Sequence, residues 1–296
     1  MYRAWLVFFS FTVLSQSSCM QSKKMVDDLN KAIREKFTIA ETRIAVAFED
    51  LQTGKNIFIN EHDNFHAAST MKTPVLIELY KQAATGKFSL TDSIEIRNSF
   101  KSIVDGSEYS LDSADDSEFG LYKKIGQKVT IDELAYKMII LSSNLATNLL
   151  IDLVKADSIM QTMHSIGAND IKVLRGVEDG KAFEKGLNNS VTAQDLMLIY
   201  KMIAGEKFVG SKEMIKTLSD QQFNEIIPAQ LPKEVKVAHK TGSITGVQHD
   251  SGIVFLPDGR KYVLVLLSKF KPEDEKKVIQ LMADISKMIY DHMNTN

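Results

Sequence analysis

The sequence predicts an α+β fold in which an antiparallel β-sheet is flanked by N- and C-terminal helices and accompanied by an all-helical lobe. Two observations predict this class. Alternating apolar patterns, typical of strands, lie near both ends of the chain, and patterns with a period of about 3.6 residues fill the middle. Helices segregated between two sets of strands are typical of α+β architectures. We expect one domain over residues 20–296, with an α/β lobe (24–68 and 232–296) and a helical lobe (69–231).

The composition is that of a folded globular protein without an excess of positive charge. Hydrophobic residues make up 44% and charged residues 25% of the 296 residues, which argues against a disordered chain and against many membrane spans. There are 36 basic and 38 acidic residues, so the formal net charge is -2. Because binding to a phosphate backbone depends on clustered Lys and Arg, we expect no nucleic-acid partner.

Residues 1–19 have the form of a signal peptide. Arg3 supplies a positive charge, and the apolar run at residues 4–14 is shorter than the roughly 20 residues that a membrane-spanning helix needs. Cys19 is the only cysteine, and its position after small residues resembles a bacterial lipoprotein cleavage site, although Gln16 stands where Leu is usual. We expect export to the periplasm or cell envelope. Cys19 then either carries a lipid anchor, which is the one membrane contact that we expect, or is a free thiol in a soluble exported protein.

The first part of the mature chain predicts a helix, a hairpin and a second helix. Apolar residues recur at helical spacing over residues 25–37, and residues 43–49 and 56–60 alternate on either side of a Gly-containing turn. After Ser69 the pattern is helical to about Tyr80. A proline in the first turn of that helix is tolerated because first-turn amides have no intrahelical partner.

Residues 102–121 form an acidic segment without Lys or Arg. Its six acids are Asp105, Glu108, Asp112, Asp115, Asp116 and Glu118. Their spacing does not match the pattern of a calcium-binding loop. We therefore expect a solvated insertion rather than a calcium site.

The remaining middle segment predicts further helices. Thr130 and Glu133 have the form of a capping box that begins a helix, and a second apolar run covers residues 145–154. Residues 168–190 are irregular and rich in Gly and Asn, and Thr192 begins another helix that runs through Ile203.

The C-terminal segment predicts three strands and a helix. The strands cover residues 235–238, 251–255 and 262–270, and the last two are joined by a turn with an Asp-Gly pair, a strong hairpin signal. Pro272 then begins a helix whose acidic first turn suits the helix dipole.

Ser69-Thr70-Met71-Lys72 is an S-x-x-K sequence at the start of a predicted helix. A serine hydroxyl is a weak nucleophile at neutral pH, and Lys72 lies on the same helical face, within reach as a base. The helix start also offers free backbone NH groups where an oxyanion would form. A lone tetrapeptide of this form is common, so its weight depends on what accompanies it.

Two further motifs follow in order. Ser142-Ser143-Asn144 interrupts two apolar helical runs, and Lys240-Thr241-Gly242 lies at the end of a predicted strand. With its three motifs in this order, the sequence resembles the class A β-lactamases and penicillin-binding proteins, class A most closely. The resemblance runs from about Met25 to Met293 and implies an active-site serine hydrolase whose substrate is a β-lactam or a peptidoglycan-like molecule.

The resemblance implies a role for each matching residue. Ser69 would attack the lactam carbonyl and become acylated, Lys72 would help to accept its proton, and Ser142 would relay a proton to the leaving nitrogen. The Asn144 amide would hold the side-chain amide of the substrate.

The third motif is implied to bind the substrate carboxylate. Lys240, Thr241 and Ser243 would form this edge, since an ammonium with flanking hydroxyls suits an anion. The backbone NH groups of Ser69 and Ser243 would form the oxyanion hole.

Two departures from the family pattern stand out. Ser143 replaces the usual Asp of the second motif, which we expect to affect loop support more than chemistry. The family glutamate that activates the hydrolytic water has two candidates. Glu178 lies at the expected distance beyond the second motif, whereas Glu184 matches the local form E-x-x-L-N. We favour Glu178.

The histidines of the sequence give only weak support for another kind of active site. His66 and His239 invite a Ser-His-Asp interpretation, but no G-x-S-x-G elbow accompanies them. The six histidines form no H-E-x-x-H or other close metal pair, so we expect no metal and no cofactor. The leading hypothesis is a monomeric class A β-lactamase. The alternatives are a D,D-peptidase or other serine hydrolase on the same scaffold, and a penicillin-binding lipoprotein that acylates without turnover.

Overall fold

The computed structural model describes residues 24–39 and 41–295. The predicted signal peptide and Cys19 lie outside the described residues. Within the described ranges, none of the helices is both long and apolar enough to cross a membrane.

A five-stranded antiparallel sheet forms the centre of the molecule, which confirms the predicted fold class. Its strands, in spatial order, are β2 (Asn56–Ile59), β1 (Arg43–Asp50), β11 (Lys261–Lys269), β10 (Val247–Phe255) and β9 (Lys236–Ile244). Every neighbouring pair is antiparallel. The N-terminal hairpin therefore pairs with the C-terminal strands through β1 and β11, and β9 is an edge strand.

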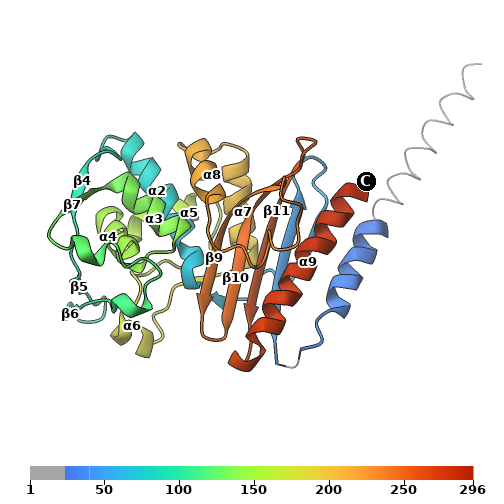
Figure 1. Ribbon diagram of the computed structural model, residues 1–296, viewed down its shortest axis with the longest axis horizontal. Helices are drawn as coiled ribbons and strands as arrows, with labels where there is room; N and C mark the ends of the chain where they lie inside the picture. The colour runs from blue at the N-terminus through green and yellow to red at the C-terminus, as the bar shows by residue number, and fades with distance from the viewer. Residues whose placement is uncertain (1–23, 40, 296) are drawn as a thin grey trace, which may run out of the picture.

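Helices cover both faces of the sheet (Figure 1). Residues 24–35 are helical and lie with α9 (Glu275–Thr295) on one face, whereas α7 (Ala193–Ala204) contacts the other. The two-residue period of β1 divides its side chains between two cores: Ile44, Val46 and Phe48 belong to one core, Ala45 and Ala47 to the other. This division explains why the strand is buried on both sides.

The middle of the chain is mainly helical. Besides α7, its helices are α2 (Lys72–Ala84), α3 (Ile131–Ile140), α4 (Asn144–Val154), α5 (Ala156–Ser165), α6 (Gly180–Glu184) and α8 (Ser211–Ser219). Short 3-10 turns are η1 (Ala68–Met71), η2 (Ser113–Asp115) and η3 (Tyr122–Lys124), with η4 (Pro272–Asp274) before α9. Two-stranded sheets join β3 (Phe65–His66) to β8 (Ser190–Val191), β4 (Ser93–Glu95) to β7 (Lys128–Thr130) and β5 (Phe100–Lys101) to β6 (Glu108–Tyr109). The expectation of an all-helical lobe did not include these short strands.

Several predicted helix starts agree with the structure. The Thr130 hydroxyl accepts a hydrogen bond from the backbone NH of Glu133 at 3.2 Å, and the Thr192 hydroxyl accepts one from Asp195 at 3.1 Å. Helix α3 and helix α7 therefore begin at side-chain caps of the kind that the sequence indicates.

The acidic segment at residues 102–121 differs from expectation. Asp116 and Glu118 are buried, with exposed fractions of 5% and 8%. The two carboxylates accept hydrogen bonds from backbone NH groups, and Lys137 also donates to Glu118 at 2.9 Å. The prediction of a solvated insertion is wrong for these two acids, because they have polar partners that compensate for their burial.

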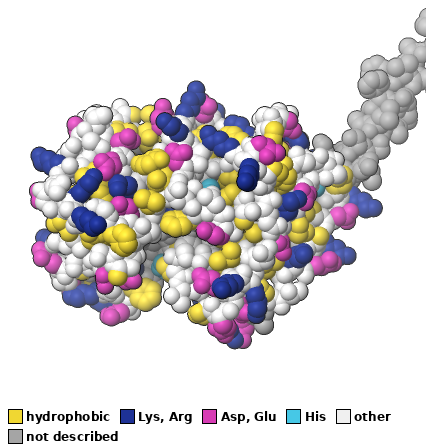
Figure 2. Space-filling model, viewed as in Figure 1, with side chains coloured by type: hydrophobic (Ala, Val, Ile, Leu, Met, Phe, Trp, Pro, Cys, Tyr) yellow, Lys and Arg dark blue, Asp and Glu magenta, His cyan; other side chains and the backbone are white. Residues whose placement is uncertain are grey.

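Charge is spread rather than grouped on the face of the molecule that Figure 2 shows. Lys and Arg side chains are interspersed with Asp and Glu over the face shown in Figure 2. This distribution agrees with the small formal net charge of -2.

Candidate active site

Ser69 lies in η1, directly before α2. The preceding residue, Ala68, has φ of 45°, which is uncommon for a residue with a side chain. A Cβ atom on Gly242 would lie 3.1 Å from the backbone nitrogen of Ser69, so the glycine lets strand β9 approach the turn that carries the serine. Within the described part of the chain, the Ser69 hydroxyl forms no hydrogen bond. The turn thus offers this hydroxyl and the neighbouring backbone NH group to an incoming molecule.

Lys72 is fully buried at the first turn of α2. Its Nζ atom donates to the carbonyl oxygen of Ser142 at 2.7 Å, to the Ser142 hydroxyl at 3.2 Å and to Asn144 Oδ1 at 3.0 Å. Burial lowers the pKa of Lys72 to about 7, and the negative charges of Asp116 and Glu178 oppose that shift. A substantial fraction of this amine is therefore neutral near pH 7 and able to accept a proton.

Lys240 extends from strand β9 of the sheet to the Ser142 hydroxyl. It is fully buried on β9, and its Nζ atom donates to the Ser142 hydroxyl at 3.1 Å and to the Thr241 carbonyl oxygen at 2.9 Å. Burial, and then the nearby charge of Lys72, hold the pKa of Lys240 well below its usual value, although Asp250 acts in the opposite direction. A bound anion would favour its ammonium form.

The Ser142 hydroxyl is the point where these two lysines meet. Ser142 lies between α3 and α4 with φ of 57°, a left-handed conformation that is strained for serine. Because its oxygen accepts two N–H donors, both lone pairs are used and its own proton is left to donate. This hydroxyl is arranged to give a proton to a group in the adjoining cavity.

Glu178 lies beside the second motif, and Glu184 does not contact it. Glu178 Oε1 accepts a hydrogen bond from Asn144 Nδ2 at 2.8 Å, and Oε2 accepts one from the backbone NH of Asp112 at 3.3 Å. Partial burial raises the pKa of Glu178, although its hydrogen bond from Asn144 acts against this. Glu184, at the end of α6, is exposed. Of the two candidates, the structure brings Glu178 next to the lysine and amide cluster.

The backbone before Glu178 is held by Asn148 of α4. Asn148 Oδ1 accepts from the Val177 NH at 2.6 Å, and its Nδ2 atom donates to the Val177 carbonyl at 3.0 Å. Glu178 itself has φ of 62°. A two-point contact with the neighbouring peptide keeps this strained residue in position.

Of these groups, Ser69, Ser142 and Asn144 line a cavity of about 400 Å³. Its lining residues are Ser69, Asp115, Ser117, Ser142, Asn144, Phe223, Glu225, Ile226, Thr241, Ser243, Gln248 and Ile279. The lining combines hydroxyl groups and the Asn144 amide with the apolar side chains of Phe223, Ile226 and Ile279. A small polar substrate with an apolar substituent suits such a lining.

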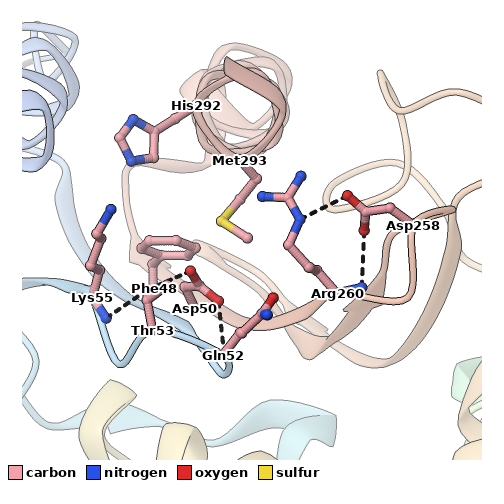
Figure 3. A pocket seen from close by; sticks show the side chains of 9 residues that line it. All are labelled: Phe48, Asp50, Gln52, Thr53, Lys55, Asp258, Arg260, His292 and Met293. Carbon is pink, nitrogen blue, oxygen red and sulfur yellow. Dashed lines mark hydrogen bonds and ion pairs between the residues drawn. The ribbon is translucent and has the colours of Figure 1, made fainter. Parts of the chain in front are cut away.

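A second cavity, of about 440 Å³, lies at the turn between β1 and β2, near the C-terminal end of α9 (Figure 3). Its polar groups have structural partners: Asp50 accepts from the Gln52 NH at 2.9 Å, and Arg260 donates to Asp258 at 2.7 Å. Thr53 donates its hydroxyl to Asp50. That hydroxyl accepts from the backbone NH of Lys55 at 3.3 Å and not from a lysine side chain. Among the described residues, this cavity therefore lacks the contact between a hydroxyl and a lysine amine that is found at Ser142.

The three motifs thus meet at one cavity, with Glu178 alongside. The sequence interpretation missed Asp116, Asn148 and Gln248, whose Nε2 atom donates to the Ser243 hydroxyl at 2.8 Å. Only the acidic character of residues 102–121 could have drawn attention to Asp116. Across residues 24–39 and 41–295, the structure contains no group of three or more His, Cys, Asp or Glu that could hold a metal ion.

Comparisons with known proteins show the family to which the chain belongs. The model of the β-lactamase enzyme family matches residues 27–293. A β-lactamase of Bacteroides uniformis is 25% identical over 258 residues, covering 81% of this chain and 83% of the relative. The structure of PBP-A superposes with a TM-score of 0.78 at 23% identity, covering 91% of this chain and 97% of PBP-A. A β-lactamase from Sphaerobacter thermophilus gives 0.76 at 25% identity, covering 92% and 98%. With a family match over most of its length, this chain belongs to the β-lactamase enzyme family.

Proposed function

We propose that this protein is an exported, monomeric serine hydrolase of the class A β-lactamase type, which opens the β-lactam amide through an acyl-enzyme on Ser69. The observation that carries the proposal is the meeting of two buried lysines at the Ser142 hydroxyl, on the wall of the cavity that contains Ser69. In the proposal, residues 1–19 direct export to the periplasm or cell envelope, with Cys19 as a lipid-anchor site.

Acylation begins when the Ser69 oxygen attacks the lactam carbonyl. Lys72 accepts the serine proton, which its pKa of about 7 allows. Backbone NH groups of Ser69 and Ser243 stabilise the oxyanion, at about 3 to 4 kcal/mol per donor in other serine hydrolases. As the carbon–nitrogen bond breaks, Ser142 gives its proton to the nitrogen and takes one from Lys72. The proton removed from Ser69 is thereby passed to the leaving group.

Substrate binding uses the edge of the sheet and the second motif. Lys240, Thr241 and Ser243 bind the carboxylate of the β-lactam, whose negative charge restores the ammonium form of the buried lysine. The Asn144 side chain accepts a hydrogen bond from Lys72 and donates one to Glu178, so its orientation is fixed. The same amide is available to hold the side-chain amide of the substrate.

Deacylation requires a base for water. Glu178, hydrogen-bonded to Asn144, takes a proton from a water molecule, which attacks the acyl carbonyl. The bond to Ser69 Oγ then breaks, and the serine oxygen takes up the proton that Glu178 removed from the water. The contact between Glu178 and Asn144 favours turnover over a stable acyl adduct.

The proposal predicts the acid side of the pH profile. Only the neutral form of Lys72 accepts the Ser69 proton, and burial lowers its pKa to about 7. Below about pH 7, kcat/KM for a chromogenic β-lactam is therefore expected to rise about tenfold per pH unit, and to level off above it. Steady-state measurements in buffers of constant ionic strength check this. A profile that does not change across neutral pH would contradict the role of Lys72.

The function is tested with the wild-type protein and two substrates. Rapid, repeated turnover of nitrocefin is expected, with little or no release of D-Ala from an acyl-D-Ala-D-Ala peptide. The reverse preference would identify a D,D-peptidase. An adduct that persists for hours in intact-mass spectra, without turnover, would identify a penicillin-binding protein. Either result would overturn the proposed hydrolysis of β-lactams.

A further inference from the structure

Asp116 is a buried carboxylate at the start of helix α4, contributed by a distant part of the chain. Its Oδ2 atom accepts hydrogen bonds from the backbone NH groups of Asn144 and Leu145, both at 2.9 Å, and from the Ser143 hydroxyl at 3.4 Å. Backbone NH groups at a helix start have no intrahelical acceptor, and an anion there is stabilised by the helix dipole. Asp116 therefore provides the acceptor for the free NH groups in the first turn of the helix that carries the second motif.

Asp116 is itself held in place. The Tyr122 hydroxyl donates to Oδ2 at 3.2 Å, and the Glu118 NH donates to Oδ1 at 3.0 Å. Burial and the neighbouring charge of Asp116 raise the pKa of Tyr122, so this phenol keeps the proton that it donates. The carboxylate has donors on both oxygens and little freedom to turn away.

We infer that Asp116 is a positioning residue for catalysis: it supplies, from the acidic segment, the carboxylate that the second motif lacks because Ser143 replaces Asp. This inference rests on the proposed function. Asp116 is not among the residues that line the cavity. It acts through Asn144, whose backbone it binds and whose side chain contacts both Lys72 and Glu178.

Asp116 also acts on Lys72 through its charge. The titratable groups that face this lysine are Asp116, Glu178 and Lys240, from the acidic segment, the loop before α6 and strand β9. The two carboxylates favour the ammonium form, and Lys240 disfavours it. The charge of Asp116 partly offsets the lowering of the Lys72 pKa by burial. When that charge is removed, the pKa of Lys72 falls further. A residue with a structural role alone would not move this pKa.

The test compares Asp116→Asn with Glu118→Gln. Both variants remove one buried carboxylate from the same segment, but Glu118 bonds Gly120, Leu121 and Lys137 rather than the second motif. In D116N we expect kcat/KM for nitrocefin to fall about tenfold. The part of its pH profile in which kcat/KM rises with pH, the acid limb, should shift to lower pH by about one unit. In E118Q the acid limb should stay in place.

An independent readout does not require activity. Asp116→Ala leaves the NH groups of Asn144 and Leu145 without their acceptor, and hydrogen exchange of these two amides is expected to become faster than in wild type and in E118Q. Unchanged exchange in D116A, or an unshifted acid limb in D116N, would overturn the inference. If wild type itself does not react with β-lactams, the proposed function fails, while the exchange experiment still reports on the contact.

Ser143→Asp in the D116N background is the complementary variant. It returns a carboxylate to the position where the family motif has one, and we expect it to recover most of the lost rate. It should also move the acid limb back toward that of wild type. No recovery would contradict the claim that the two positions serve the same purpose.

Discussion

Replacing Ser69 with alanine is expected to abolish both the covalent adduct with penicillin and the hydrolysis of nitrocefin. The loss should be on the order of a million-fold in kcat, as when the nucleophile is removed from other serine hydrolases. Other hydroxyls line the cavity, but Ser142 already accepts hydrogen bonds from two lysines and is arranged to donate its proton. Intact-mass spectrometry and steady-state assays measure the two losses.

A matched control is Ser89→Ala. Ser89 is exposed, and its side chain bonds only its own turn at Thr91, so this variant should keep wild-type rates. The midpoint temperature of thermal unfolding of the Ser69 variant should be unchanged or slightly higher than that of wild type, since a hydroxyl without a hydrogen-bond partner is removed. Penicillin that still attaches covalently to the alanine variant would exclude Ser69 as the nucleophile.

Replacing Glu178 with glutamine is expected to trap the acyl-enzyme. An amide cannot accept the proton of the attacking water, so deacylation should slow by about a thousand-fold. Acylation should remain, because Gln keeps an oxygen that accepts the hydrogen bond from Asn144. The adduct should therefore accumulate after mixing with penicillin and persist in intact-mass spectra, while nitrocefin turnover falls.

Glu184→Gln separates the two glutamate candidates. It makes the same chemical change at an exposed residue of α6 that lies outside the contacts of Asn144. We expect wild-type turnover and no lasting adduct. Accumulation of the adduct in the Glu184 variant, with normal turnover in the Glu178 variant, would reverse the assignment.

The strands of the sheet could largely be predicted because their residues follow a two-residue period. In β1 the alternation places successive side chains in different cores, and the Asp258-Gly259 pair predicts the turn where Gly259 has φ of +89°. The extension of β9 to Ile244 was missed. Residues 239–243 are polar or Gly, and the segment up to Ile244 remains a strand because β10 pairs with it. Tertiary pairing overrides weak local preference there.

The candidate site was predictable in its residues but not in its geometry. Three short motifs indicated Ser69, Ser142 and Lys240, because chemistry demands particular residue types. Asp116 was assigned to solvent since sequence alone does not reveal which carboxylate meets free NH groups at a distant helix start. The competition between Glu178 and Glu184 likewise depends on a loop conformation that involves strained backbone at Glu178.

The most direct test is to locate the bound penicillin in the Glu178→Gln protein by proteolysis and tandem mass spectrometry. Nucleophilic attack by Ser69 predicts a single acyl group on that residue, absent from the Ser69→Ala, Glu178→Gln double variant. An acyl group on Ser142 or Thr241, or no covalent product under any conditions, would contradict it.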